Sequence, residues 1–246
     1  MVHESADADA VATAIVRGAF EYQGQKCSAA SRVYVPEALW PAIEAELASQ
    51  LDEITMGAPD DFSHFANAVI DRRAYDRITG YIARAHDDPG VRVAHGGTFS
   101  DETGFFVAPT VLVASDPQYV TMCDELFGPV VTIYVVPANT PWKDTLALVD
   151  RTSPYALTGA VFARDRAVLA VATEALADAA GNFYINDKPT GAVVGQQPFG
   201  GARGSGPNDK AGSAVNLLRW TSLRTIKETF NPPTHFAYPF LEKGAI

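Results

Sequence analysis

Helical and strand-like patterns of apolar residues alternate along the chain. The first segment has the helical period, with a predicted buried stripe at Val11, Ile15, Gly18 and Tyr22. Ser5 or Asp7 is expected to cap this helix, because both side chains carry an oxygen that accepts from the first free N–H groups. Gly24 is expected to end it in a left-handed conformation, and a short loop over residues 24–28 follows.

The same alternation recurs further along the chain. Helices are predicted over residues 37–53, 66–86, 142–149 and 165–179. Strands are predicted over residues 32–35, 91–94, 130–136, 157–162 and 181–186. Strand–helix–strand units with short connections favour an α/β fold, in which helices flank a largely parallel sheet.

The pattern changes after Gly195. A glycine-rich loop over residues 199–206 precedes a lone strand-like segment from Arg219 to Lys227, and a proline-containing tail follows. A strand without a neighbour exposes a row of unpaired N–H and C=O groups, so it is expected to pair with another chain or to be buried. We expect the first outcome.

Composition narrows the class of protein. The 246 residues are 47% hydrophobic and 20% charged, which excludes intrinsic disorder. A net charge of −10 argues against nucleic acid as a partner. No apolar run reaches the ~18 residues of a membrane span, and the first residues lack the pattern of a signal peptide. Two cysteines are too few for a disulfide framework, so we expect a reducing, cytoplasmic compartment.

Motifs for phosphate and metal binding are missing from the sequence. It contains no G-x-x-x-x-G-K-[ST] loop, and no G-x-G-x-x-G lies between a strand and a helix. The glycines of residues 199–206 are followed by Pro207 and Asn208 instead of a helix start, which makes phosphate binding there a weak hypothesis. The five histidines are scattered without metal-ligand spacing, so no metal site is predicted.

Cys27 is the strongest candidate for a catalytic residue. It follows Gly24 in a loop of small residues, and Lys26 adds positive charge that favours the nucleophilic thiolate. On this local pattern alone, a buried structural cysteine is an equal alternative. Cys123 has no activating neighbour in the sequence and is interpreted as structural. A reducing compartment argues against a disulfide between the two.

A thiol hydrolase or acyltransferase that works without a redox cofactor is a second class of function for Cys27. Such an enzyme needs a histidine base, and no histidine is near Cys27 in the sequence. His64, His86 or His95 would have to approach the thiol through folding. The sequence leaves this alternative open.

Longer motifs resemble one known family. Residues 20–28, Phe-Glu-Tyr-Gln-Gly-Gln-Lys-Cys-Ser, are similar to the nucleophile segment of aldehyde dehydrogenases, and residues 123–129, Cys-Asp-Glu-Leu-Phe-Gly-Pro, to their cofactor segment. Residues 181–188, 190–201 and 219–222 narrow the resemblance to the pyrroline-5-carboxylate dehydrogenase branch. That branch oxidises glutamate γ-semialdehyde to glutamate with NAD. The resemblance therefore implies an aldehyde-dehydrogenase-type catalytic domain.

The resemblance implies catalytic and cofactor roles for three residues. Cys27 would attack the aldehyde to give a thiohemiacetal, and loss of hydride would leave a thioester that water hydrolyses. Glu125 would hydrogen-bond the nicotinamide ribose of NAD, and Phe127 would pack beside the cofactor. Without the resemblance, Glu125 would be a solvated loop carboxylate and Phe127 an ordinary core residue.

The resemblance also implies an anchor for the amino-acid end of the aldehyde. The residues assigned to it are Ser28, Thr190, Gly191, Ala192 and Phe199. Glycine exposes backbone N–H groups that can bind a carboxylate, which would let an acidic protein hold an acidic substrate. A plain turn and a core phenylalanine are the simpler alternatives. Lys188 and Arg203 are expected to support these loops through charge-assisted hydrogen bonds.

The expected domain organisation follows from the same resemblance. Residues 1–213 correspond to the catalytic domain, 214–229 to a projecting oligomerisation strand and 230–246 to a C-terminal tail, while the family's N-terminal NAD-binding domain is absent from this chain. Homo-oligomerisation through residues 216–228 is expected. Because the cofactor domain is absent, a catalytically dead interaction module is a further alternative.

Overall fold

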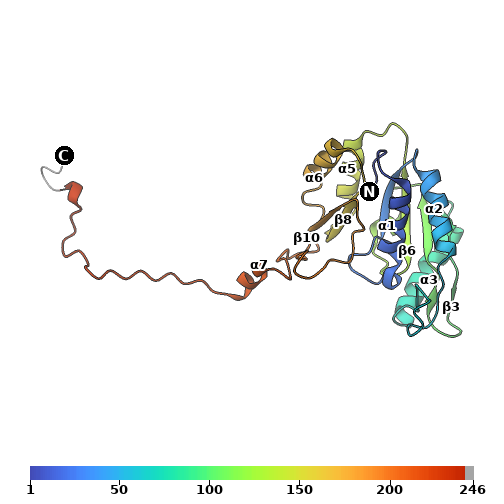
Figure 1. The fold of residues 1–246 in the computed structure, drawn as a ribbon, viewed down its shortest axis with the longest axis horizontal. Coiled ribbons are helices and arrows are strands. Elements are labelled where there is room, and N and C mark those ends of the chain that lie inside the picture. Colours follow the sequence, from blue (N-terminus) through green and yellow to red (C-terminus); the bar gives the residue numbers. More distant parts are fainter. Residues whose placement is uncertain (242–246) are drawn as a thin grey trace.

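A body and a long C-terminal segment make up the computed structural model, which describes residues 1–241. The C-terminal segment leaves the body at helix α7 (Ala214–Leu217) and projects far from it (Figure 1). Residues 242–246 of the predicted tail lie outside the described residues. Within residues 1–241, every helix is too short or too polar to cross a membrane.

The main sheet has four strands in the order β1–β6–β5–β2. They are β1 (Arg32–Pro36), β6 (Val130–Val136), β5 (Thr110–Ala114) and β2 (Val91–His95). Strands β1 and β5 run parallel to β6, whereas β2 runs antiparallel to β5. The predicted α/β fold with parallel strands is confirmed, although β2 makes the sheet mixed.

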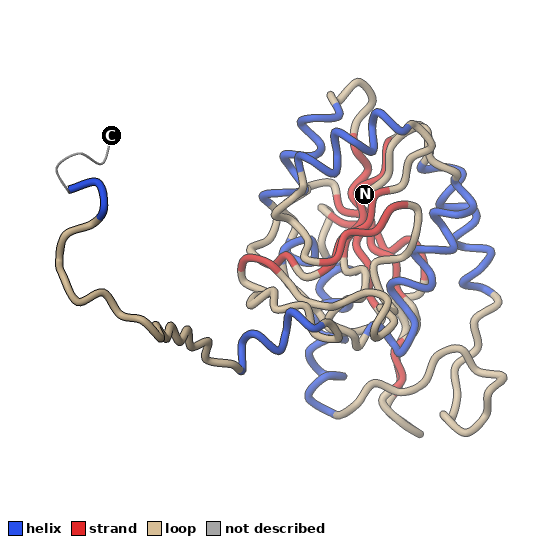
Figure 2. The backbone as a smooth tube through the Cα atoms, turned by 60° about the vertical axis from the view of Figure 1, so that its left-hand side comes forward, coloured by secondary structure: helices blue, strands red, loops and turns tan. Residues whose placement is uncertain are grey.

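Helices cover both faces of this sheet (Figure 2). On one face lie α1 (Ala8–Phe20) and α2 (Trp40–Asp52), packed on Val33 and Val35 of β1. On the other face lie α3 (Arg72–Asp87) and α4 (Val120–Cys123), packed on the intervening Tyr34. This alternation is what a strand with two buried faces requires, because successive side chains point to opposite sides.

A second, smaller sheet pairs β8 (Thr158–Val161) in parallel with β9 (Asn182–Ile185). Helices α5 (Trp142–Arg151) and α6 (Arg166–Ala175) pack on it. The first residues of the chain join the two sheets: the Val2 N–H donates to the Tyr34 carbonyl at 2.9 Å, and the His3 N–H donates to the Phe162 carbonyl at 2.9 Å. Residues 1–3 thus lie between β1 and β8.

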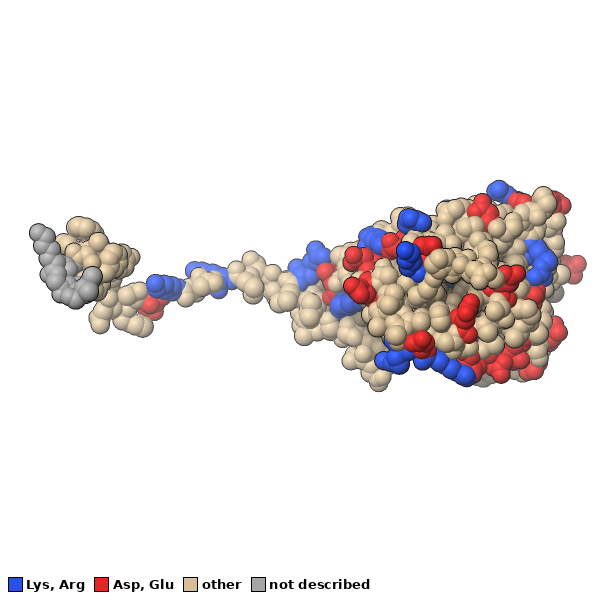
Figure 3. All heavy atoms as spheres, turned by 90° about the horizontal axis from the view of Figure 1, so that it is seen from above, with Lys and Arg blue, Asp and Glu red and all other residues tan. Residues whose placement is uncertain are grey.

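The remaining elements are short. They are the 3₁₀ turns η1 (Glu21–Gly24), η2 (Leu218–Trp220) and η3 (Pro239–Leu241), and the strand pairs β3 (Phe99–Ser100) with β4 (Phe106–Val107) and β7 (Tyr155–Ala156) with β10 (Ala202–Arg203). Acidic side chains are spread over the body, with basic side chains between them, in the view of Figure 3. This distribution fits the net charge of −10.

One predicted helix begins later than its apolar pattern suggested, and the buried stripe predicted on the first helix ends early. The helix predicted over residues 66–86 starts at Arg72, because the Asp71 side chain caps it by accepting from the Ala74 N–H at 2.7 Å. Ile70, which was placed in that helix, is 81% exposed. The first helix is capped by Asp7 and starts at Ala8. Its stripe ends before Tyr22, which is exposed because the chain has already turned left-handed there.

The strand predicted over residues 214–229 is wrong for residues 214–220, which form α7 and η2. Residues 221–229 are exposed and carry no assigned helix or strand. A strand is defined by a hydrogen-bonded neighbour, and this segment leaves the body before it can meet one of this chain's own strands. Pairing of residues 216–228 with another subunit stays a prediction, as do the proposed domain boundaries.

Candidate active site

The loop that carries Cys27 begins with three successive left-handed residues. Tyr22, Gln23 and Gly24 have φ of 54°, 58° and 63°. This conformation ends α1 abruptly and, as predicted, places Gly24 in the left-handed region. The turn is held by the Gln25 N–H, which donates to the Tyr22 carbonyl at 3.1 Å. Cys27 follows as an exposed free thiol.

Backbone contact joins this loop to the loop that carries Glu125. A Cβ added to Gly24 would clash with the Gly128 carbonyl oxygen and would lie 2.7 Å from the Ala19 carbonyl oxygen. A separate contact ties the Cys27 loop to the segment before α3, because the Gln25 side-chain oxygen accepts from the Ile70 N–H at 2.9 Å. The glycine at position 24 is therefore required by φ and by space, and it brings residues 27 and 125 into neighbouring loops.

Replacing Gly24 with alanine is expected to lower the free energy of unfolding by about 3 kcal/mol, since a left-handed L-residue costs ~1–2 kcal/mol and overpacking ~1–3 kcal/mol. Urea denaturation measures this loss. Gly80→Ala is the matched control: Gly80 lies in α3 with no atom within 4 Å of the added Cβ, so the change should stabilise the helix. Equal effects of the two substitutions would contradict the assigned contact.

Glu125 and Phe127 lie on an exposed loop between α4 and β6. Desolvation raises the pKa of the Glu125 carboxyl, and the charge of Arg32 partly opposes this shift. Phe127 has φ of 54° and is 39% exposed, although its neighbour Leu126 is buried. A left-handed bulky residue is an uncommon, strained conformation that clusters at functional sites. The geometry presents an aromatic ring and a carboxylate on the loop that touches Gly24.

The structure brings two predicted anchor residues together. The Ser28 and Thr190 hydroxyl groups share a hydrogen bond of 2.7 Å, and both residues are buried. Gly191 follows with φ of 84°, which favours glycine there, and Ala192 is half-buried. The anchor loop thus meets the residue next to Cys27. The binding of a substrate by these residues stays a prediction.

Phe199 is placed by a different interaction. Its N–H and carbonyl exchange hydrogen bonds of 2.8 Å with Ala211, and its side chain is half-buried. A Cβ on Gly181, just before β9, would clash with the carbonyl oxygen of Gly200 in the neighbouring glycine-rich loop. Glycine at position 181 therefore allows the two backbones to pack closely. Arg203 supports the loop as expected, because its guanidinium donates to the Asp150 carboxylate at 2.6 Å.

A carboxylate that was not singled out in the sequence bridges the two loops. Glu21 accepts from the Lys188 ammonium at 2.6 Å and from the Lys26 ammonium at 3.0 Å. Partial burial alone would raise the pKa of Glu21, but these hydrogen bonds outweigh it and hold the pKa below its usual value. Lys26 therefore does not act as an unpaired charge beside the thiol, which corrects the interpretation drawn from its position in the sequence.

The other cysteine and the histidines have partners of their own. Cys123 is a half-buried free thiol whose sulfur donates to the Gln118 carbonyl at 3.7 Å. His86 hydrogen-bonds the Gly97 carbonyl at 3.2 Å, and His64 hydrogen-bonds the Thr55 hydroxyl at 3.1 Å. Nothing in these contacts provides a histidine base for Cys27. Among residues 1–241, no three His, Cys, Asp or Glu side chains gather as metal ligands.

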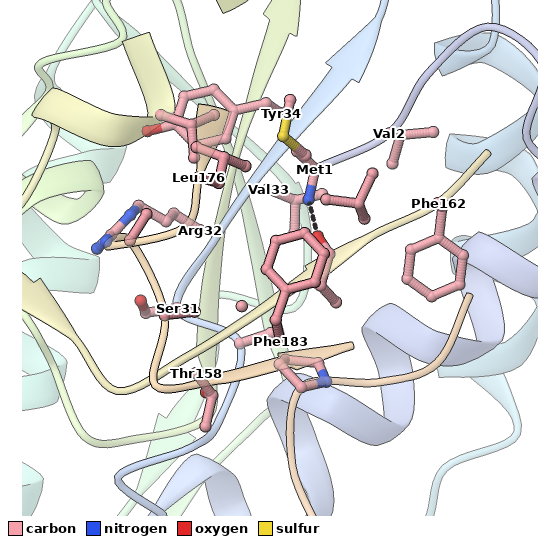
Figure 4. Close-up of a pocket in the computed structure, with 18 of the residues that line it drawn as sticks. Met1, Val2, Ser31, Arg32, Val33, Tyr34, Thr158, Phe162, Leu176 and Phe183 are labelled. Atoms are coloured by element: carbon pink, nitrogen blue, oxygen red, sulfur yellow. Dashed lines mark hydrogen bonds between the residues drawn. The ribbon is translucent and has the colours of Figure 1, made fainter. Parts of the chain in front are cut away.

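A cavity of about 150 Å³ lies beside this site, between β1 and β8. Its lining includes residues 29–34 but not Cys27. The Met1 amine lies among the lining residues (Figure 4). That amine donates to the Ala160 carbonyl at 2.7 Å. Burial, and to a lesser extent the charge of Arg32, lower the pKa of the amine from 8.0 to about 5.

Known proteins are similar to this chain in sequence and in fold. The chain is 52% identical over 240 residues to a delta-1-pyrroline-5-carboxylate dehydrogenase of Dictyostelium discoideum and 49% identical over 242 residues to that of Homo sapiens; each alignment covers 98% of this chain. The solved structure of the Mycobacterium tuberculosis enzyme bound with NAD superposes with a TM-score of 0.86 at 49% identity, over 98% of this chain and 44% of that one.

The chain spans 43% of the length of these Dictyostelium and human relatives. A second solved structure, 1-pyrroline-5-carboxylate dehydrogenase from Thermus with bound NAD, has a TM-score of 0.80 at 33% identity, over 89% of this chain and 40% of that one. The family model for the aldehyde dehydrogenase family matches residues 1–226. The chain belongs to the aldehyde dehydrogenase family.

Proposed function

We propose that this chain is the catalytic part of an NAD-dependent dehydrogenase that oxidises glutamate γ-semialdehyde to glutamate in proline catabolism. The observation that carries the proposal is the position of the Cys27 loop. It touches the Glu125 loop through Gly24 and Gly128, and it touches the anchor loop through Ser28 and Thr190. A thiol, a cofactor contact and a substrate anchor thus belong to one site.

The chemistry begins at the Cys27 sulfur. The thiolate adds to the aldehyde carbon, and uptake of a proton at oxygen gives a thiohemiacetal. Its carbon–hydrogen bond would then break, with the hydride passing to bound NAD and the hydroxyl proton to water. The resulting thioester is hydrolysed by water, which releases the acid and regenerates the thiol. Exposure of Cys27 gives the aldehyde access to the sulfur.

NAD is the cofactor that this site fits, since it supplies a hydride acceptor when bound. The Glu125 carboxylate can accept hydrogen bonds from ribose hydroxyl groups. The Phe127 ring stands on the same loop and offers an aromatic surface to the nicotinamide. The name of the solved Mycobacterium tuberculosis structure records bound NAD, which supports this assignment.

The proposed function is tested by comparing kcat/KM for glutamate γ-semialdehyde and for butanal, in the polypeptide that joins this chain to a dinucleotide-binding domain. The semialdehyde should be preferred by about ten- to a hundred-fold, because an absent carboxylate leaves buried donors unpaired at ~1–3 kcal/mol each. Thr190→Val should reduce that preference and leave the butanal rate unchanged. Equal kcat/KM values for the two aldehydes would refute the assigned substrate.

We also propose that residues 216–228 join two copies of the chain. The support is the exposure of large apolar side chains in a segment that leaves the body, among them Trp220, Leu223 and Ile226. Ending the chain at Ser213 should convert a dimer into a folded monomer, as measured by sedimentation velocity and circular dichroism. A full chain that is already monomeric at micromolar concentration would refute the proposal.

A reducing compartment is proposed for this chain. Two free cysteines fit a reducing environment, and a cytoplasmic location stays a prediction. The Dictyostelium and human relatives are named mitochondrial, which makes the mitochondrion a second candidate.

A further inference from the structure

Two cross-links join the Cys27 loop to the anchor loop. The first is the hydrogen bond between the Ser28 and Thr190 hydroxyl groups. The second is the Glu21 bridge, defined as Lys26–Glu21–Lys188, in which one carboxylate receives both ammonium groups. Since a direct bond and an ionic bridge span the same gap, the separation of the two loops is set at two points.

The Glu21 bridge is held firmly for a group near the surface. Its three side chains are 24–25% exposed, and the Lys188 contact at 2.6 Å is a short charge-assisted bond. Helix α1 approaches the anchor loop closely beside the bridge, because a Cβ on Gly18 would lie 3.3 Å from the Pro189 ring. Helix α1, which ends next to Glu21, therefore packs directly against the loop that the bridge ties down.

The bridge also places positive charge at the anchor. The Lys188 ammonium lies 3.7 Å from the position that a Cβ on Gly191 would occupy. The Lys26 ammonium, by contrast, lies over the Tyr22 ring at 5.1 Å from its centroid in addition to its bond with Glu21. Lys26 is paired with Glu21 and lies over the Tyr22 ring, so it is not a free cation beside the thiol. The bridge therefore positions the two loops.

We propose that Glu21 is a positioning residue that fixes the distance between Cys27 and the anchor at residues 190–192, and so selects the length of the carboxylate-bearing aldehyde. This inference rests on the proposed function. A substrate whose carboxylate is held at the anchor reaches the sulfur only if its chain matches the gap. Loss of the bridge would widen the range of accepted lengths, because placement errors of ~1 Å weaken a near-attack geometry strongly.

The test uses thiol-reactive probes of graded length and needs no cofactor. In a Cys123→Ser background, Cys27 is labelled with ω-carboxyalkyl methanethiosulfonates of two to about five methylene groups, and with neutral alkyl reagents of the same lengths. The ratio of the two labelling rates should peak at one length. Glu21→Gln and Lys188→Met should each flatten the peak by roughly threefold or more.

Two controls separate positioning from a general loss of structure or charge. Lys188→Arg keeps a donor for Glu21 and should keep the peak. Glu53→Gln removes an exposed carboxylate at the end of α2 and should leave the profile unchanged. A peak that persists in Glu21→Gln would overturn the positioning role alone. A wild-type chain without any peak would overturn the anchor of the proposed function, and the positioning role with it.

Discussion

Cys27→Ser is expected to abolish aldehyde oxidation, with a loss of at least about a thousand-fold in kcat. A serine hydroxyl is a far weaker nucleophile than a thiolate at neutral pH, and among residues 1–241 no histidine hydrogen-bonds residue 27 to activate it. The assay follows NADH formation in the polypeptide that includes a dinucleotide-binding domain. Circular dichroism should remain unchanged, because the exposed Cys27 side chain contributes little to packing.

Cys123→Ser is the matched control for this substitution. Cys123 is half-buried and donates to Gln118, so its replacement should preserve activity. Mass-mapped labelling with iodoacetamide should likewise modify Cys27 before Cys123. Faster labelling of Cys123, or loss of activity in Cys123→Ser alone, would show that the nucleophile has been assigned to the wrong residue.

The elements that sequence predicts best are those with a complete local signal. Strand β6 runs over Val130–Val136 as expected, because its β-branched run is long and bounded by Pro129 and Pro137. Strand β5 was missed, although Thr110–Ala114 contains a similar apolar run and lies beside β6 in the sheet. A short apolar run of this kind also fits a segment of buried helix, and only its pairing with β6 and β2 identifies it as a strand.

In the candidate site too, features set by neighbouring residues could be predicted, whereas contacts between residues far apart in the sequence could not. The left-handed Gly24 and the exposed loop around Cys27 follow from neighbouring residues. The partnership of Glu21 with Lys188 joins residues 167 positions apart, and that of Ser28 with Thr190 spans 162. No pattern within one segment encodes such contacts. The resemblance to a family named the anchor residues, but it gave no sign of the carboxylate between the two loops.

The exposed segment after α7 marks another limit of the sequence patterns. The segment around Leu223 and Ile226 is strand-like in composition, yet its sequence carries no information on where a partner strand lies. Residues 214–220 became helical because a short turn satisfies backbone groups locally when no strand is adjacent. The strand hypothesis for residues 221–228 thus depends on a second copy of the chain.

Acidification from pH 8 to pH 5 is expected to destabilise a polypeptide with a free amine at Met1 by about 3 kcal/mol. The folded-state pKa of this amine is lowered from 8.0 to about 5, chiefly by burial. Between these values the unfolded chain binds one more proton than the folded chain, so the free energy of unfolding falls as the pH falls. The size follows from ~1.4 kcal/mol for each pH unit, reduced near pH 8 and pH 5, where the amine is only half-protonated in one of the two states. Urea denaturation at a series of pH values measures it.

Acetylation of the Met1 amine is the control that isolates this group. The acetylated nitrogen is an uncharged amide that can still donate to the Ala160 carbonyl, so the hydrogen bond at the cavity is kept while the titration is removed. The acetylated chain should therefore lose much less stability between pH 8 and pH 5 than the chain with a free amine. Intact mass must confirm Met1 in both samples. Parallel pH dependences would mean that the amine escapes to water in the folded protein, and that residues 1–3 do not hold β1 and β8 together as the hydrogen bonds of Val2 and His3 indicate.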